Sequence, residues 1–155
     1  MPTPLSRLLD FLILATSSAG FGACLTSVLR TGAYGWLIPV APYMYEARDF
    51  YADAVLAGMG GLLVLMALER FARMRASAAL RAVAFFLAVG VAVYLGPPAP
   101  VVFGNTWAPG EATRELFLAQ MDMVLPIAVA ATALRSAMRA VWRRAARQSS
   151  NRLPA

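Results

Sequence analysis

Residues 8–29, LLDFLILATSSAGFGACLTSVL, form a long apolar stretch between Arg7 and Arg30. At 1.5 Å per residue, a helix of this length exceeds the hydrocarbon thickness of a bilayer, which is about 30 Å. Three further apolar stretches follow, at about 52–71, 78–95 and 113–141. The sequence therefore predicts an all-α polytopic membrane protein. In this interpretation residues 1–147 form a single bundle of four transmembrane helices, and residues 148–155 form a disordered tail.

The composition agrees with a membrane protein. Apolar residues make up 60% of the chain and charged residues only 14%, whereas a soluble domain carries about 25% charged residues. The formal net charge of +6 comes from fourteen basic residues, all arginine, and most of them lie beside the apolar stretches. Membrane orientation and anionic lipid head groups explain arginines in such places. We therefore expect membrane lipids as partners and no nucleic acid.

The distribution of arginines predicts the orientation of the bundle. If both termini are cytoplasmic, eleven arginines flank the helices on the cytoplasmic side and three, Arg30, Arg48 and Arg114, lie outside. Acidic residues are distributed the opposite way, with two inside and six outside. Cytoplasmic flanks are enriched in positive charge. The sequence thus predicts a multi-pass protein of a bacterial-type inner membrane with both termini in the cytoplasm.

The first apolar stretch has two alternative interpretations. A cleaved signal peptide also begins with positive charge followed by an apolar segment, but Asp10 and the length of residues 8–29 favour a permanent helix. Phe21-Gly22-Ala23-Cys24 only partly matches a lipoprotein cleavage sequence, because Phe21 replaces the usual aliphatic residue. We expect Cys24 to be a small apolar residue within the helix.

Small residues recur on the first two stretches. Association of helices in lipid depends on close approach of their backbones, which small residues allow. The positions that we expect to pack are Ala15, Ala19, Ala23, Gly20 and Gly22 in the first stretch, and Gly58 and Gly61 in the second. Two interpretations remain open: packing between the first two helices of one bundle, or docking of a second subunit.

The loop between the first two helices is rich in aromatic residues. Tyr34, Trp36, Tyr43 and Tyr45 lie around the apolar segment 37–42, and Trp107 lies in the third loop. Tyrosine and tryptophan favour the membrane–water interface. The loop is therefore predicted to lie along the outer face, either as an aromatic belt or as a docking surface. In the second case Phe103, Asn105 and Trp107 would close over it.

The fourth stretch holds the best candidate for chemistry. Gln120 and Asp122 lie within it, and Pro126, which lacks an N–H, leaves the carbonyl of Asp122 without its helical partner. A carboxylate at membrane depth is costly and often functional. Asp122, Gln120 and Asp53 are therefore the candidate cation- or proton-binding residues. The alternative is that Asp122 reaches the interface and pairs with Arg114 or Arg48.

Other polar and sulfur-containing residues receive structural interpretations. Asp10 is expected to neutralise Arg81 or Arg139. Met121, Met123 and Met44 allow a copper(I) site in principle, but scattered methionines in lipid-facing helices are much commoner, and no metal is predicted.

The residues that the chain lacks restrict its function. The sequence contains no histidine and no lysine, and it has one cysteine. This composition excludes histidine-ligated haem, a retinal Schiff base, histidine-based zinc sites, Ser-His-Asp hydrolysis and a two-cysteine redox cycle within the chain. We predict no catalytic residue and no cofactor.

Two main functions remain. The first is a non-catalytic membrane subunit that scaffolds or stabilises a larger inner-membrane complex, with other membrane subunits or further copies of itself as partners. The second is a small homo-oligomeric transporter or channel with an acidic site at Asp122 and Asp53. A membrane enzyme acting on lipid or quinone is a third, less favoured alternative.

Overall fold

A computed structural model describes residues 4–104 and 106–150, without the side chains of residues 75, 143 and 146–150. In these ranges the regular structure is helical, apart from one isolated bridge between Ala41 and Tyr45. The elements are α1 (Pro4–Thr31), α2 (Ala47–Arg70), α3 (Ala72–Ala76), α4 (Ala78–Tyr94), η1 (Pro100–Val102), α5 (Glu111–Leu116), η2 (Leu118–Gln120) and α6 (Met121–Ser150).

Three segments are long and apolar enough to cross a membrane: Pro4–Thr31, Ala47–Leu68 and Glu111–Trp142. The fourth apolar helix, α4, has 17 residues, which corresponds to a length of roughly 26 Å at the α-helical rise. This length is less than the hydrocarbon thickness of about 30 Å. The fold is therefore that of an all-helical, multi-pass membrane protein in which three helices have the length of a full crossing.

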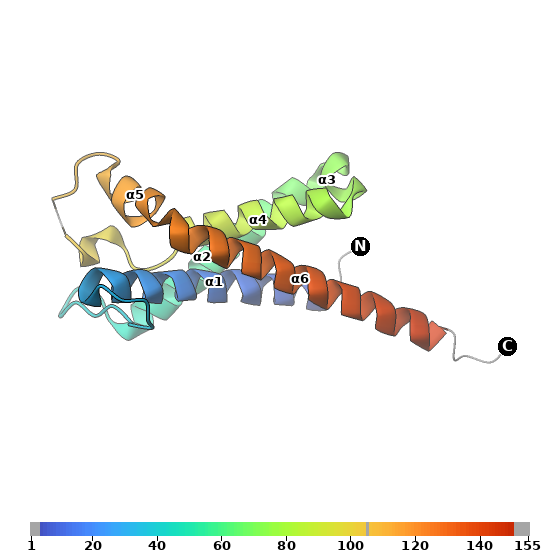
Figure 1. The fold of residues 1–155 in the computed structure, drawn as a ribbon, viewed down its shortest axis with the longest axis horizontal. Helices are drawn as coiled ribbons and strands as arrows, with labels where there is room; N and C mark the ends of the chain where they lie inside the picture. The colour runs from blue at the N-terminus through green and yellow to red at the C-terminus, as the bar shows by residue number, and fades with distance from the viewer. Residues whose placement is uncertain (1–3, 105, 151–155) are drawn as a thin grey trace.

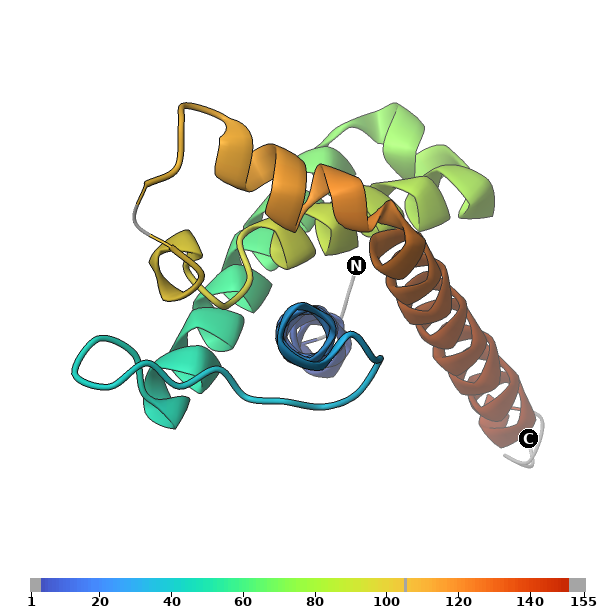
Figure 2. The same ribbon diagram turned by 60° about the vertical axis from the view of Figure 1, so that its left-hand side comes forward.

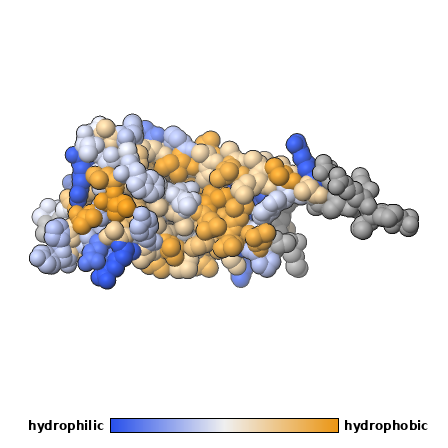
Figure 3. Space-filling model, turned by 90° about the horizontal axis from the view of Figure 1, so that it is seen from below, coloured by the Kyte–Doolittle hydropathy of each residue, from blue (hydrophilic) through white to orange (hydrophobic). Residues whose placement is uncertain are grey.

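The helices place their connections at two opposite ends of the molecule. The start of α1, the short α3 and the end of α6 share one end, and the 32–46 loop, η1 and α5 occupy the other (Figure 1). We name these the inner end and the outer end after the predicted orientation. In Figure 2, α1 is seen nearly end-on, with α2 and α4 on one side of it and α6 leading away on the other. Apolar residues dominate the middle of the face shown in Figure 3, and hydrophilic residues gather toward its ends.

Small residues allow the helices to approach closely. A Cβ added to Gly58 of α2 would lie 2.8 Å from the Cβ of Ala15 in α1. One added to Gly61 would lie 2.9 Å from both the Ala88 carbonyl oxygen and the Ala92 Cβ of α4. These distances are well below van der Waals contact, so both glycines are positions where any larger residue would separate the helices.

The second and third predicted helices differ little from the observed ones. The helix predicted at about 52 begins at Ala47, because Asp49 Oδ2 accepts a hydrogen bond of 2.8 Å from the Glu46 amide and caps the first turn. The third ends at Tyr94, shortly before Gly96-Pro97-Pro98, as expected from proline's missing N–H.

The fourth helix, predicted as one element at about 113–141, is divided in the structure. The chain breaks after α5 at Phe117, where ψ is −58° and φ is −127°, and continues through η2 into α6. Gln120 Nε2 donates to the Glu115 carbonyl at 3.2 Å, which satisfies one of the backbone groups released by the break. At its other end α6 reaches Ser150, three residues into the predicted tail, and residues 151–155 lie outside the described part of the chain.

Candidate functional site

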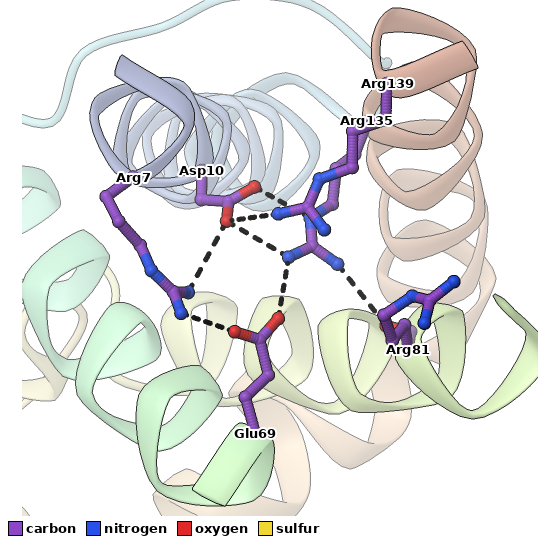
Figure 4. Close-up of polar contacts among 6 residues, drawn as sticks. All are labelled: Arg7, Asp10, Glu69, Arg81, Arg135 and Arg139. Carbon is purple, nitrogen blue, oxygen red and sulfur yellow. Dashed lines mark hydrogen bonds and ion pairs between the residues drawn. The ribbon is translucent and has the colours of Figure 1, made fainter. Parts of the chain in front are cut away.

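Ionic side chains from three helices meet at the inner end in a group that we call the inner cluster: Arg7 and Asp10 of α1, Glu69 of α2, and Arg135 and Arg139 of α6 (Figure 4). Arg135 is its centre and is only 3% exposed. Its Nε donates to Asp10 Oδ1 at 2.7 Å, and its Nη2 donates to Asp10 Oδ2 at 3.0 Å and to Glu69 Oε1 at 3.1 Å. One guanidinium therefore joins α1, α2 and α6.

Arg135 also contacts α4. Its Nη1 donates to the backbone carbonyl of Arg81 at 3.3 Å, and its Cζ lies 4.3 Å from the centroid of the Phe85 ring. The aromatic face attracts a cation at this distance. All four long helices are thus connected through one side chain.

The remaining members of the cluster complete the charge pairing. Arg139 Nη2 donates to Asp10 Oδ2 at 2.9 Å, so the predicted pairing of Asp10 with Arg139 is confirmed. Arg7 bonds to the other oxygen of Glu69. Burial raises the pKa of Glu69, but the hydrogen bonds and charges of Arg7 and Arg135 lower it more, so that its pKa lies below the ordinary value.

We interpret the inner cluster as structural. Each carboxylate has at least two arginine partners, which compensates the cost of removing the charges from water. Sequence reasoning missed the role of Arg135. The available signal was its position inside the predicted 113–141 span, where an arginine is costly unless it is paired.

The predicted cation-site residues have different hydrogen-bond partners. Asp122 is exposed and accepts a hydrogen bond of 2.8 Å from the Tyr34 hydroxyl. Asp53 accepts one of 2.8 Å from the Tyr45 hydroxyl, and Gln120 bonds to a backbone carbonyl of its own segment. Among the described residues, Asp122 and Asp53 each bond to a different tyrosine, Tyr34 and Tyr45.

The alternative pairing of Asp122 with Arg114 or Arg48 is not observed among the described residues. Arg114 pairs with Glu115 at 3.0 Å, and Arg48 lies 3.2 Å from Glu46. The break before α6 explains the difference, because it places Asp122 in the first turn of a helix. A carboxylate is favourable near the positive end of the helix dipole and needs no arginine there.

The aromatic loop folds back along α1. The Leu37 amide donates to the Ala23 carbonyl at 3.3 Å, and Ser27 Oγ donates to the Ala33 carbonyl at 2.9 Å. Tyr45 is 6% exposed and packs with Phe50. Burial, followed by its bond to a carboxylate, raises the pKa of Tyr45 far above 10.

The other aromatic residues of the predicted docking loop are mostly exposed. Tyr34 is 70% exposed, Trp36 62% and Tyr43 fully exposed. Trp107 is partly buried, and its Nε1 donates to the Pro100 carbonyl within its own loop at 3.1 Å. Asn105, which was expected to help close the third loop, lies outside the described residues.

The predicted small residues face two different environments. Ala19 and Ala23 are buried in a cluster with Tyr45 and Phe50. A Cβ on Gly22 would lie 2.0 Å from the Pro97 carbonyl oxygen, whereas one on Gly20 would meet nothing within 4 Å. Gly20 therefore lies on an open face of α1.

That open face forms one wall of a groove of about 590 Å³ between α1 and α6, which we call the α1–α6 groove. Its lining residues are Ile13, Thr16, Ser17, Gly20 and Cys24 of α1 and Ile127, Ala130, Ala131 and Leu134 of α6. The hydroxyls of Thr16 and Ser17 each donate at 2.7 Å to a carbonyl one turn earlier in α1. With those donors used inside the helix, the groove offers mainly apolar contact.

In the described part of the chain, no three His, Cys, Asp or Glu side chains are grouped closely enough to hold a metal ion. The sequence matches no protein-family model, no curated protein and no solved structure.

Proposed function

We propose that this chain is a non-catalytic subunit of a larger inner-membrane assembly, and that a transmembrane helix of a partner subunit occupies the α1–α6 groove. The groove itself is the observation that carries the proposal. It follows α1 from Ile13 to Cys24, a distance of roughly 16 Å at the helical rise. Its small residues permit the backbone approach on which helix association in lipid depends.

Contacts beyond both ends of the groove favour a preformed binding site for such a helix. At the inner end Arg139 of α6 pairs with Asp10 of α1, and at the outer end Tyr34, which follows α1, bonds to Asp122 of α6. These contacts hold α1 and α6 together beyond both ends of the opening. The space between them is therefore a property of the helix arrangement and does not require one helix to detach.

The proposal includes the predicted topology: four crossings, a bacterial-type inner membrane and cytoplasmic termini. The short α4 crosses if the bilayer thins locally or if its flanking residues reach the interface, which costs a fraction of a kcal/mol per Å of mismatch. Reporter fusions at both termini test the orientation. Opposite locations for the two reporters would contradict it.

A photo-crosslinking residue at Gly20 tests the groove directly. The matched control places the same residue at Leu63 of α2, which is 66% exposed and does not line the groove. We expect a covalent adduct with an unlike membrane polypeptide from Gly20 and not from Leu63. An adduct with lipid alone, or equal polypeptide adducts from both positions, would contradict a helix in the groove.

Purification in mild detergent separates this function from transport. An unlike chain that co-purifies, and that is lost when Gly20 is replaced by tryptophan, supports the subunit. A lone homo-oligomer that conducts ions in liposomes, and whose conduction vanishes in Asp122→Asn, supports the small transporter or channel instead.

A further inference from the structure

A cavity of about 400 Å³ lies toward the outer end, between the second half of α1, the start of α2, the end of α4 and the helix α5. Phe21 of α1, Asp53 of α2, Tyr94 of α4, and Thr113 and Phe117 from the α5 segment are among its lining residues. The segment 95–100 completes the wall. A volume of this order is typical of sites for small organic ligands.

The charge of the lining is unbalanced. Asp53 is the one Asp, Glu or Arg among the described residues that line the cavity. Its carboxylate accepts a hydrogen bond from Tyr45, and no arginine of the described chain forms an ion pair with it. A ligand that neutralises this wall therefore carries positive charge.

The rest of the lining favours an organic cation over a bare metal ion. Tyr94 and Phe117 meet edge to face with ring centroids 5.2 Å apart, and Phe21 adds a third ring. Aromatic rings attract organic ammonium groups, and apolar walls contact a carbon skeleton. Two hydroxyls, Tyr94 Oη and Thr113 Oγ1, lie 3.4 Å apart and supply polar contacts. A hard metal ion requires several oxygen ligands, and the cavity lining contains a single carboxylate.

We propose that this outer cavity binds a small organic cation with an apolar body, with Asp53 as the counter-charge and the rings of Phe21, Tyr94 and Phe117 as the apolar contact. This inference is independent of a partner helix in the α1–α6 groove, because none of the lining residues is shared between the two sites.

Binding of benzyltrimethylammonium to the full chain in detergent micelles tests the proposal by isothermal titration calorimetry, with p-toluenesulfonate as the anionic comparison. We expect saturable binding of the cation only. Asp53→Asn should weaken it about tenfold, because it removes the one charged side chain among the described residues that line the cavity. Glu115→Gln, which removes a nearby carboxylate that does not line the cavity, should change it less than about twofold.

A second pair of variants tests whether the cation binds in the outer cavity. Ala99 lines the cavity, and Val101, two residues further along the same loop, does not. Ala99→Phe should fill the space and abolish binding, and Val101→Phe should retain it. If Asp53→Asn fails to fold, Asp53→Glu keeps the charge and should still bind. The proposal is overturned if the wild type does not bind, if Glu115→Gln weakens binding as much as Asp53→Asn, or if Ala99→Phe binds as the wild type does.

Discussion

Replacing Arg135 by methionine tests whether the inner cluster holds the bundle together. The change keeps much of the side chain's apolar length but removes three hydrogen bonds to carboxylates, one to the Arg81 carbonyl, and the contact with Phe85. Removing one partner of a buried ion pair costs about 3–5 kcal/mol. Asp10 keeps Arg139, and Glu69 keeps Arg7. We therefore expect the lower end of that range, a loss of about 3 kcal/mol in the free energy of unfolding.

The assay is titration of the protein from dodecylmaltoside into SDS micelles, with tryptophan fluorescence reporting the folded fraction. Arg144→Met is the matched control, because Arg144 lies nine residues further along α6, is exposed and makes no ion pair with any described residue. The control should change stability by no more than about 0.5 kcal/mol. A loss below about 1 kcal/mol for Arg135→Met, or one equal to the control's, would refute the reasoning.

The remaining predictions concern packing, acidity and the aromatic loop. Gly22→Ala should destabilise the protein in the same SDS titration, because its Cβ meets the Pro97 carbonyl, whereas Gly20→Ala should be neutral or stabilise by up to about 1 kcal/mol from helix propensity. Because the pKa of folded Glu69 is lowered, its ion pairs stabilise the protein above about pH 4.5, and this stabilisation is lost as the pH falls through the folded-state pKa. In SDS titrations from about pH 6 to pH 3, the free energy of unfolding should therefore fall more steeply for the wild type than for Glu69→Gln. The hydrogen bond to Asp122 of α6 is the main reason why the pKa of Tyr34 is raised above 10.0, so this contact should persist below about pH 10 and be lost as the pH rises through the folded-state pKa. In Tyr34→Phe, the amide hydrogens of residues 32–40 should exchange faster, and unchanged exchange would contradict the contact.

The helical class of the fold and the end of α4 could be predicted because they depend on local chemistry. Residues 8–29 are long enough and apolar enough for a crossing whatever surrounds them, and Pro97 ends α4 because proline has no N–H to donate. The break at Phe117 could not be predicted in the same way. Nothing in the composition of residues 113–120 forbids a helix, so the sequence pattern predicts no break there.

The difference between local chemistry and helix packing also explains which contacts of the charged residues were predicted. The prediction for Asp10 named two partners, Arg81 and Arg139, because both lie on the same predicted side of the membrane, and the structure shows the pairing with Arg139. The central position of Arg135 was not predicted, because its one guanidinium bonds to carboxylates of two different helices, Asp10 of α1 and Glu69 of α2. Such pairs are determined by how α1, α2 and α6 pack, and sequence spacing does not encode that arrangement.

Asp122 shows how the place where a helix begins bears on a functional interpretation. Within a continuous helix from about 113, this carboxylate lies at membrane depth and invites a role in binding a cation. Within α6, which begins at Met121, it lies in the first turn, beside an exposed tyrosine.

The early end of α4 explains why there is space for the outer cavity. α1 continues to Thr31 at the outer end, whereas α4 stops at Tyr94 and the chain turns through Gly96 and Pro97. The Pro97 carbonyl lies where a side chain at position 22 would otherwise be, so the absence of a Cβ at Gly22 lets this turn rest directly on α1. The space that further turns of α4 would have filled is instead bounded by segment 95–100 and by α5. The same prolines that limit α4 as a membrane span therefore create the cavity for which Asp53 supplies the charge.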